Sequence, residues 1–247
     1  MKIIKHKGSE NMEKRKIYLV AAIIFFNLFL IFTALVILVD VQPIGPQGSY
    51  VGLATMNGAF KDTIGSLSDT DEGYSTLWYN ISEIAGFATL FVALGFAILG
   101  LCQAIKRKSI LSVDKEIVAL GSFYVAVFAS YLLFEIITIN YRPVIMAGEL
   151  EASYPSSHTM LSLCIMSTAI FEINRLFNGK KSIIILADTV FVTMALTVLV
   201  GRLLSGVHWL TDIIAGILIS ATLICLYRFA IFSLSRVKTK KQDKENA

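Results

Sequence analysis

Six long apolar segments alternate with polar stretches along the chain. Each is close to the ~20 residues that a helix needs to cross the hydrocarbon core of a bilayer. This pattern predicts an all-α protein, a polytopic membrane bundle of six transmembrane helices. The expected spans are roughly 17–39, 82–104, 117–139, 158–175, 183–201 and 208–232.

The first segment, IYLVAAIIFFNLFLIFTALVILV, is too long for the apolar core of a cleaved signal peptide. No small-residue cleavage site follows it, so we expect it to remain as a membrane span. The stretch 40–81 is long and rich in Gly, Pro, Asp and aromatic residues. Two interpretations of this stretch stay open, a cover over one face of the bundle and a solvated loop. The predicted organisation is therefore a 1–16 tail, a 17–232 six-span domain and a 233–247 tail.

Composition supports a membrane location. Hydrophobic residues make up 55% of the 247 residues and charged residues only 16%, whereas a soluble domain carries roughly 25% charged residues. The mean hydropathy is +0.70. The odd number of cysteines, all in or beside apolar runs, predicts packing residues rather than a disulfide framework or a zinc site. They are Cys102, Cys164 and Cys225.

The distribution of positive charge sets the expected orientation. If the spans alternate, all but three of the 22 Lys and Arg residues lie on one side of the membrane. Positively charged loops stay cytoplasmic, so both basic tails are expected inside and the 40–81, 140–157 and 202–207 loops outside. The three cations expected outside are Lys61, Arg142 and Arg202.

The segment GRLLSGVHWLTDIIAG places Arg202, His208 and Asp212 within eleven apolar-rich residues. On a helix, positions 208 and 212 share a face. A carboxylate there can accept the proton of one imidazole nitrogen and leave the other nitrogen as a nucleophile or base. Arg202 is expected in the short outer turn, where a planar guanidinium suits a phosphate.

Two further constellations are expected on the same outer face. In EASYPSSHTM, Pro155, Ser156 and Ser157 open the fourth span and His158 falls in its first turn. A helix start favours an anion, and a histidine beside it suits general acid catalysis. In INYRPVI, Arg142 lies just beyond the third span.

The residues alone leave other functions open. Histidines and arginines at a membrane interface can be polar anchors. His158, His208 and Asp212 could form a two-His, one-carboxylate metal site, although two arginines at the same place would repel a divalent cation. A transporter could use Arg, His and Asp as a proton relay, which is expected near mid-bilayer rather than at span ends.

Taken in order, these pieces resemble the signature of the type 2 phosphatidic acid phosphatase family, KxxxxxxRP, PSGH and SRxxxxxHxxxD. The chain reads EIITINYRP at 135–143, PSSH at 155–158 and GRLLSGVHWLTD at 201–212. The resemblance implies a helical core of the vanadium haloperoxidase type. It also implies a metal-independent phosphatase, without a cofactor, acting on a phosphorylated membrane lipid such as phosphatidate, phosphatidylglycerol phosphate or a polyprenyl diphosphate.

The resemblance also implies a role for each matching residue. His208 would attack phosphorus and form a phosphohistidine, Asp212 would orient it, and His158 would protonate the leaving alkoxide. The remaining matching residues would hold the phosphoryl oxygens: Arg142, Arg202, Ser156 and Ser157.

Three positions depart from the family pattern. Ser157 and Gly201 stand where the family has Gly and Ser, and both changes are mild. Glu135 stands where the family has a phosphate-binding lysine, which reverses a charge. We expect an active enzyme with altered headgroup preference. The alternative is a catalytically weakened relative that binds or transports phosphorylated lipids.

The expected location is a cell membrane, with the active site facing outside as the cation bias indicates. No transit-type leader is recognisable, so a bacterial plasma membrane is the default expectation. The bilayer and the lipid substrate are then its expected partners. No nucleic acid and no obligatory protein partner are expected.

Overall fold

The computed structural model describes residues 2–146 and 148–245, with side chains for 10–146 and 148–234. Within these residues the chain forms helices, joined by short 3-10 turns and a few isolated β-bridges. The α-helices are α1 (Lys2–Leu38), α2 (Ala54–Ile64), α3 (Thr76–Lys106), α4 (Lys115–Ile136), α5 (Ser157–Leu176), α6 (Lys181–Ser205) and α7 (Leu210–Glu245).

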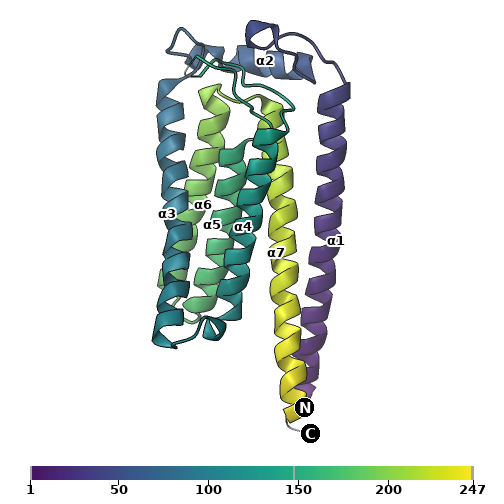
Figure 1. Ribbon diagram of the computed structural model, residues 1–247, viewed down its shortest axis with the longest axis vertical. Helices are drawn as coiled ribbons and strands as arrows, with labels where there is room; N and C mark the ends of the chain where they lie inside the picture. Colours follow the sequence, from purple (N-terminus) through teal and green to yellow (C-terminus); the bar gives the residue numbers. More distant parts are fainter. Residues whose placement is uncertain (1, 147, 246–247) are drawn as a thin grey trace.

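Six of these helices run lengthwise as one bundle, and α2 lies across one end of it (Figure 1). We call this end the α2 end. The six long helices alternate in direction, so that α1 begins and α7 ends at the opposite end. Helix α1 packs mainly on α7, while α3 packs on α6 and α5.

The prediction of an all-helical membrane bundle is confirmed. Five helices in the described part of the chain are long and apolar enough to cross a membrane, namely α1, α3, α4, α6 and α7. The remaining predicted span, 158–175, corresponds to α5, which is 20 residues long but more polar. Within the predicted 1–16 tail, the described residues from Lys2 on belong to α1. The predicted 233–247 tail continues α7 up to Glu245, and residues 246–247 lie outside the described residues.

Helix α5 is polar because it occupies the centre of the bundle. It packs against α3, α4, α6 and α7, so its polar side chains face protein rather than lipid. Thr168 is buried and donates to carbonyls of its own helix. Glu172 is buried as well, and it pairs with Arg175 and accepts a hydrogen bond from Tyr227 of α7. A polar helix at membrane depth is stable when neighbouring helices satisfy its groups in this way.

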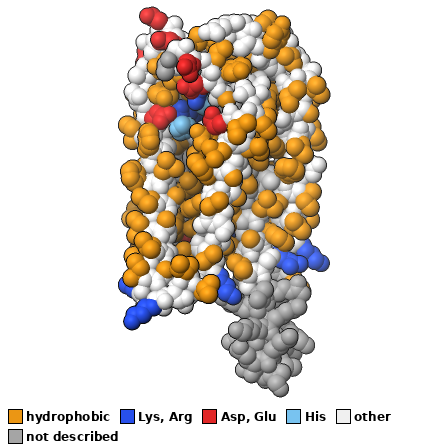
Figure 2. All heavy atoms as spheres, in the orientation of Figure 1, with side chains coloured by type: hydrophobic (Ala, Val, Ile, Leu, Met, Phe, Trp, Pro, Cys, Tyr) orange, Lys and Arg blue, Asp and Glu red, His pale blue; other side chains and the backbone are white. Residues whose placement is uncertain are grey.

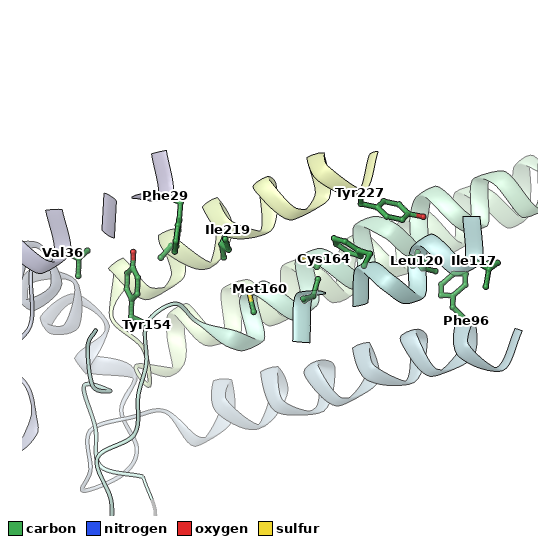
Figure 3. Close-up of a cluster of buried hydrophobic side chains, with 14 residues drawn as sticks. Phe29, Val36, Phe96, Ile117, Leu120, Tyr154, Met160, Cys164, Ile219 and Tyr227 are labelled. Atoms are coloured by element: carbon green, nitrogen blue, oxygen red, sulfur yellow. The ribbon is translucent and has the colours of Figure 1, made fainter. Parts of the chain in front are cut away.

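The apolar core follows α5 along the bundle (Figure 3). Met160 and Cys164 of α5 pack with Leu120 of α4 and with Ile219 and Tyr227 of α7. Cys164 is therefore a packing residue, as predicted, and all three cysteines are free. At the α2 end, Phe29 and Val36 of α1 and Tyr154 of the α4–α5 loop join the same cluster.

The 40–81 segment covers the α2 end. Asn57 of α2 is fully buried, and its amide donates to the carbonyl of Gly52 and to the hydroxyl of Thr211. The Asn57 side-chain oxygen in turn accepts from the Thr211 backbone N–H at 3.2 Å. Since Thr211 lies in the first turn of α7, Asn57 satisfies one of the backbone donors that a helix start leaves free.

Charge is divided between the two ends of the bundle. Figure 2 shows lysine and arginine side chains around the end opposite α2 and acidic side chains near the α2 end. Between them the surface is largely apolar. This is the arrangement of a multi-pass membrane protein whose basic loops gather on one side.

Candidate active site

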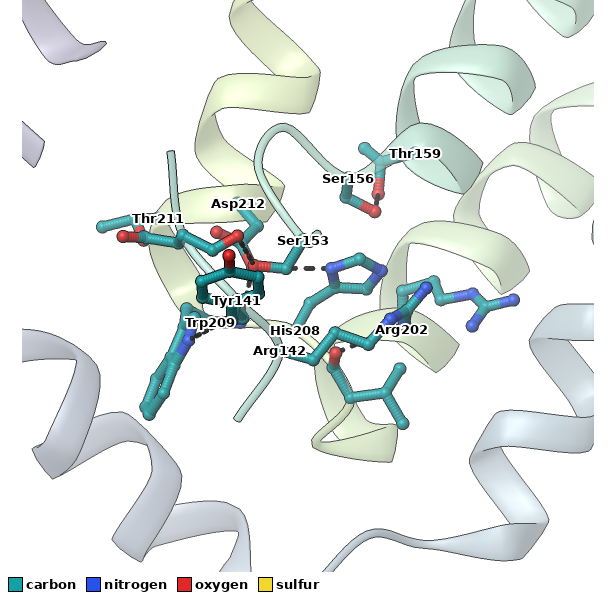
Figure 4. A network of polar contacts seen from close by, with 12 residues as sticks. Tyr141, Arg142, Ser153, Ser156, Thr159, Arg202, His208, Trp209, Thr211 and Asp212 are labelled. Carbon is teal, nitrogen blue, oxygen red and sulfur yellow. Dashed lines mark hydrogen bonds and ion pairs between the residues drawn. The ribbon is translucent and has the colours of Figure 1, made fainter. Parts of the chain in front are cut away.

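Every histidine and arginine singled out by the sequence motifs lies at the α2 end. Arg142 comes from the α4–α5 loop, His158 from the first turn of α5 and Arg202 from the last turn of α6. His208 lies in the turn between α6 and α7, and Asp212 follows in the first turn of α7. Figure 4 shows the polar network that these segments build.

The α6–α7 turn holds His208 against Asp212. Helix α6 ends at Ser205 and is followed by Gly206, whose φ of +77° lies in the left-handed region that favours glycine. Asp212 accepts a hydrogen bond from the Trp209 backbone N–H at 2.9 Å, so it caps the start of α7 from its first turn. The same oxygen, Oδ2, lies 3.5 Å from Nδ1 of His208. His208 is therefore two residues before α7, and the turn, not a shared helix face, brings the pair together.

The His208 ring is almost fully enclosed, with 3% of the residue exposed. Its Nε2 is buried without a hydrogen-bond partner. Burial, and then the nearby positive charges of Arg142 and Arg202, hold the pKa of His208 well below its usual range. The imidazole is neutral at pH 7 for this reason. A neutral imidazole with one nitrogen beside a carboxylate and the other free is a competent nucleophile.

Arg142 is fixed by the loop around it. Its Nε lies 2.9 Å from Oε2 of Glu151, and its backbone N–H donates to the Glu151 carbonyl. Its Nη1 reaches the carbonyl of Val207 at 3.5 Å. The loop is held in turn by Trp209, whose indole N–H donates to the Tyr141 carbonyl at 2.7 Å.

Arg202 lies within the last turn of α6, not in the outer turn where the sequence placed it. It is 0% exposed and donates through Nη2 to Oε1 of Glu83 in α3. Its guanidinium carbon stands 5.1 Å from the centroid of the Tyr79 ring. Helix α6 can continue through a charged residue here because α3 satisfies that charge. The Nε and Nη1 groups of Arg202 are buried without a partner and remain able to bind an anion.

His158 follows the same pattern as His208. Its Nε2 lies 3.4 Å from Oε1 of Glu83, and its Nδ1 is buried without a partner. The ring lines a small cavity between α3 and α5 together with Glu83, Phe87 and Leu161. Figure 2 shows a histidine among acidic and basic side chains near the α2 end of the visible face.

The two serines of PSSH differ in placement. Ser156 is fully buried, its backbone N–H donates to the Asp212 carbonyl at 3.0 Å, and its hydroxyl accepts from Thr159. Figure 4 shows the Ser156 and Thr159 hydroxyls facing each other. In this structure the backbone N–H of Ser156 ties the start of α5 to α7 and is not free to bind a phosphate. Ser157 is half-buried and lines a small cavity that it shares with His208.

The position of Glu135 relative to Arg142 differs from the one expected from the sequence. Helix α4 ends at Ile136, so Glu135 and Arg142 share no helix face, and Arg142 pairs with Glu151. Glu135 is an exposed residue of the last turn of α4. Glu135 nevertheless lines the same small cavity as His208.

Three residues that hold the site together lie outside the motifs, and sequence reasoning assigned them no role there: Glu83, Glu151 and Lys61. Lys61 of α2 donates to the Pro143 carbonyl at 2.9 Å and stands over the Trp209 ring at 5.4 Å, and burial lowers its pKa. It thereby clamps the residues next to Arg142 and His208. The sequence does contain one indication for Glu83, because it is the one acidic residue in the 31-residue apolar helix α3.

A metal ion would need a different grouping of donors. In the part of the chain that the structure describes, no cluster of three or more His, Cys, Asp or Glu side chains is arranged to hold one. His158, His208 and Asp212 are therefore not gathered as a ligand set. The nearest charged neighbours of both histidines include arginines.

Comparison with known proteins adds the family. The sequence profile of the PAP2 superfamily matches residues 87–234, which include all three motifs. No curated protein sequence matches the chain. A solved structure shares the fold: the crystal structure described as the first transmembrane PAP2 type phosphatidylglycerolphosphate phosphatase from Bacillus subtilis. It superposes with a TM-score of 0.57 at 16% identity, over 84% of this chain and 94% of that one. The chain therefore belongs to the PAP2 superfamily, the type 2 phosphatidic acid phosphatases.

Proposed function

We propose that the protein is an integral-membrane lipid phosphate phosphatase that works through a phosphohistidine on His208, without a metal. The single observation that carries the proposal is the pairing of His208 with Asp212 beside unpartnered arginine donors. Nε2 of His208 is free, its Nδ1 is 3.5 Å from the Asp212 carboxylate, and Arg202 has two buried donors to offer.

The reaction follows from these positions. The lone pair of His208 Nε2 attacks phosphorus, and the bond between phosphorus and the lipid oxygen breaks. His158 donates its proton to that oxygen, and the lipid leaves as an alcohol. Arg142 and Arg202 stabilise the negative charge on the equatorial oxygens, the role of a metal ion in other phosphoryl-transfer enzymes. Water, deprotonated by His158, then attacks the phosphohistidine and releases phosphate.

Phosphatidate, phosphatidylglycerol phosphate and polyprenyl diphosphates are the substrates to test. The name of the Bacillus subtilis neighbour refers to phosphatidylglycerolphosphate, and that lipid enters here as a candidate only. We place the active site on the outer face of the cell membrane with both termini in the cytoplasm, since the α2 end carries few basic side chains. Residues 17–232 would then form the phosphatase domain.

Phosphate release by the purified protein in detergent and EDTA tests the proposal. Wild type should release phosphate from at least one of the three lipids, vanadate should inhibit, and His208→Ala should be inactive. Activity that EDTA removes and zinc restores would contradict the metal-free mechanism. Specific binding of the lipids without release would favour the weakened relative that Glu135, on the wall of the site, also allows.

A further inference from the structure

Glu83 is an acidic residue of the site that none of the family motifs contains. It lies in the second turn of α3, and its Oε1 contacts Nη2 of Arg202 in α6 and Nε2 of His158 in α5. One carboxylate oxygen thus joins three helices. A carboxylate in a membrane-spanning helix is costly unless it is paired, and such residues usually serve function.

The backbone around Glu83 is shaped for this contact. A side chain at Gly201 would place its Cβ 2.7 Å from the Cβ of Ser82, and one at Gly86 would place its Cβ 2.9 Å from the His158 ring. Both distances are below normal van der Waals contact, so only glycine allows α3 to approach α6 and α5 this closely. Gly201 is also one of the departures from the family pattern, and the contact with α3 gives it a physical reason.

Each histidine of the site has a carboxylate beside one of its ring nitrogens. His208 has a carboxylate at 3.5 Å on Nδ1, and His158 has one at 3.4 Å on Nε2. In both rings the opposite nitrogen is buried with no partner. Asp212 is four residues from its histidine in sequence, whereas Glu83 reaches its histidine from another helix. Because Glu83 and His158 are far apart in sequence, no short motif can contain both of them.

We propose that Glu83 is a positioning residue that holds Arg202 and His158 in the site and gives the leaving-group histidine the negative partner that Asp212 gives the nucleophile. The inference rests on the proposed function. A carboxylate on one imidazole nitrogen favours the protonated ring, and that ring is the form that donates a proton to the leaving alkoxide. The unpartnered Nδ1 of His158 is then the donating nitrogen, and the proton passes from it to the lipid oxygen as the phosphorus–oxygen bond breaks.

Glu83→Gln separates this role from simple packing. Glutamine keeps an acceptor for Arg202 but has no charge to support a protonated His158. The variant should lose about 100-fold in kcat on phosphatidate, whose alkoxide needs a proton, in the range of general acid catalysis. It should lose less than about fivefold on p-nitrophenyl phosphate, whose leaving group departs without one. Glu83→Asp should recover part of the loss on phosphatidate.

Glu172→Gln is the matched control. Glu172 is a buried glutamate of the bundle that is likewise paired with an arginine, at 2.7 Å from Arg175. It lies 14 residues after His158 on α5, roughly 21 Å along the helix axis. It should change the rates on both esters by the same factor. Equal losses on both esters in Glu83→Gln, as in this control, would overturn the proposal.

Vanadate binding, measured by calorimetry, gives a readout that needs no turnover. Glu83→Gln should bind vanadate at least as tightly as wild type, because the site has lost a negative charge and Arg202 is still held. Binding weakened tenfold or more, as expected for Arg202→Ala, would overturn the proposal. If wild type hydrolyses neither ester, the proposed function fails, and this binding measurement alone decides the role of Glu83.

Discussion

At the scale of single residues, enclosure defines the chemistry of His208. The ring is shielded from water, and two arginines stand close enough to disfavour a second positive charge. Asp212 offsets this without being in the turn itself, because it reaches back from α7. The lowered pKa of His208 also has a cost for the fold. Because the unfolded chain binds the proton more readily, stability is complete above the ordinary histidine pKa near 6.5 and falls as the pH drops below it.

Arg142 should determine the lowest pH at which the enzyme remains active. Only neutral His208 attacks, so activity is lost as the pH falls through its pKa. Arg142→Gln removes the positive charge that lowers the pKa of His208 most and should therefore raise that pKa. The acid limb of the kcat/KM profile should move to higher pH, whereas Arg142→Lys, which keeps the charge, should leave the limb in place. An unmoved limb in the active Gln variant would mean that Arg142 does not act on His208 electrostatically.

Glu135 should affect the choice of substrate. Glu135 lines the same cavity as His208, and at an effective dielectric near 20 two unit charges ~6 Å apart interact by roughly 3 kcal/mol. A carboxylate there disfavours diphosphates more than monophosphates. Glu135→Lys should therefore raise activity on a polyprenyl diphosphate relative to phosphatidate. The same ratio in an active variant would place the side chain outside the field of the substrate.

At the scale of helices, the site depends on how closely α3 approaches α5 and α6. The start of α3 is also bound to the end of α6 through the backbone, since the Ser75 N–H donates to the Ser205 carbonyl at 2.9 Å. Gly201 then lets the two helices pack without a side chain between them. Arg202 follows Gly201 directly and contacts Glu83 of α3. A shift of α3 against α6 would therefore disturb the contact that holds the Arg202 guanidinium in the site.

Gly201→Ala should lower both stability and activity. Alanine is the better helix former by about 1 kcal/mol, yet here its Cβ would meet Ser82 at 2.7 Å. Gly95→Ala in α3 is the matched control, because nothing lies within 4 Å of its added Cβ. Thermal unfolding in detergent should show a lower midpoint for Gly201→Ala and an equal or higher one for Gly95→Ala. A Gly201→Ala midpoint at or above wild type would show that the contact is not tight.

The sequence predicted those features that depend on residues close together along the chain. Long apolar runs predicted the spanning helices, and the spacing of His208 and Asp212 predicted their pairing. It misled at Arg202, which resembled a turn residue because its stabilising partner, Glu83, lies more than 100 positions away. It also predicted no helix for 54–64, since α2 is short and is stabilised by docking onto α7 through Asn57. Contacts between distant segments leave no local pattern to read.

At the scale of the whole molecule, the division of charge predicts the orientation in the membrane. The α2 end carries the candidate site and the opposite end carries the basic loops (Figure 2). A cysteine introduced at Ser66, in the α2–α3 connection, should react with an impermeant maleimide in intact cells, and one at Ser233 should not. This measurement is best made in a variant that lacks the exposed native Cys102. The opposite labelling would place the site on the cytoplasmic face.

Trapping the covalent intermediate tests the central claim most directly. Purified protein mixed with a lipid labelled with ³²P in its terminal phosphate, and quenched within milliseconds, should carry label that is stable in base and released by acid, as a phosphohistidine is. The label should map to the peptide containing His208. It should persist longest at low water activity and be absent in His208→Ala. Steady phosphate release by wild type with no such label, or label in His208→Ala, would contradict a mechanism through His208.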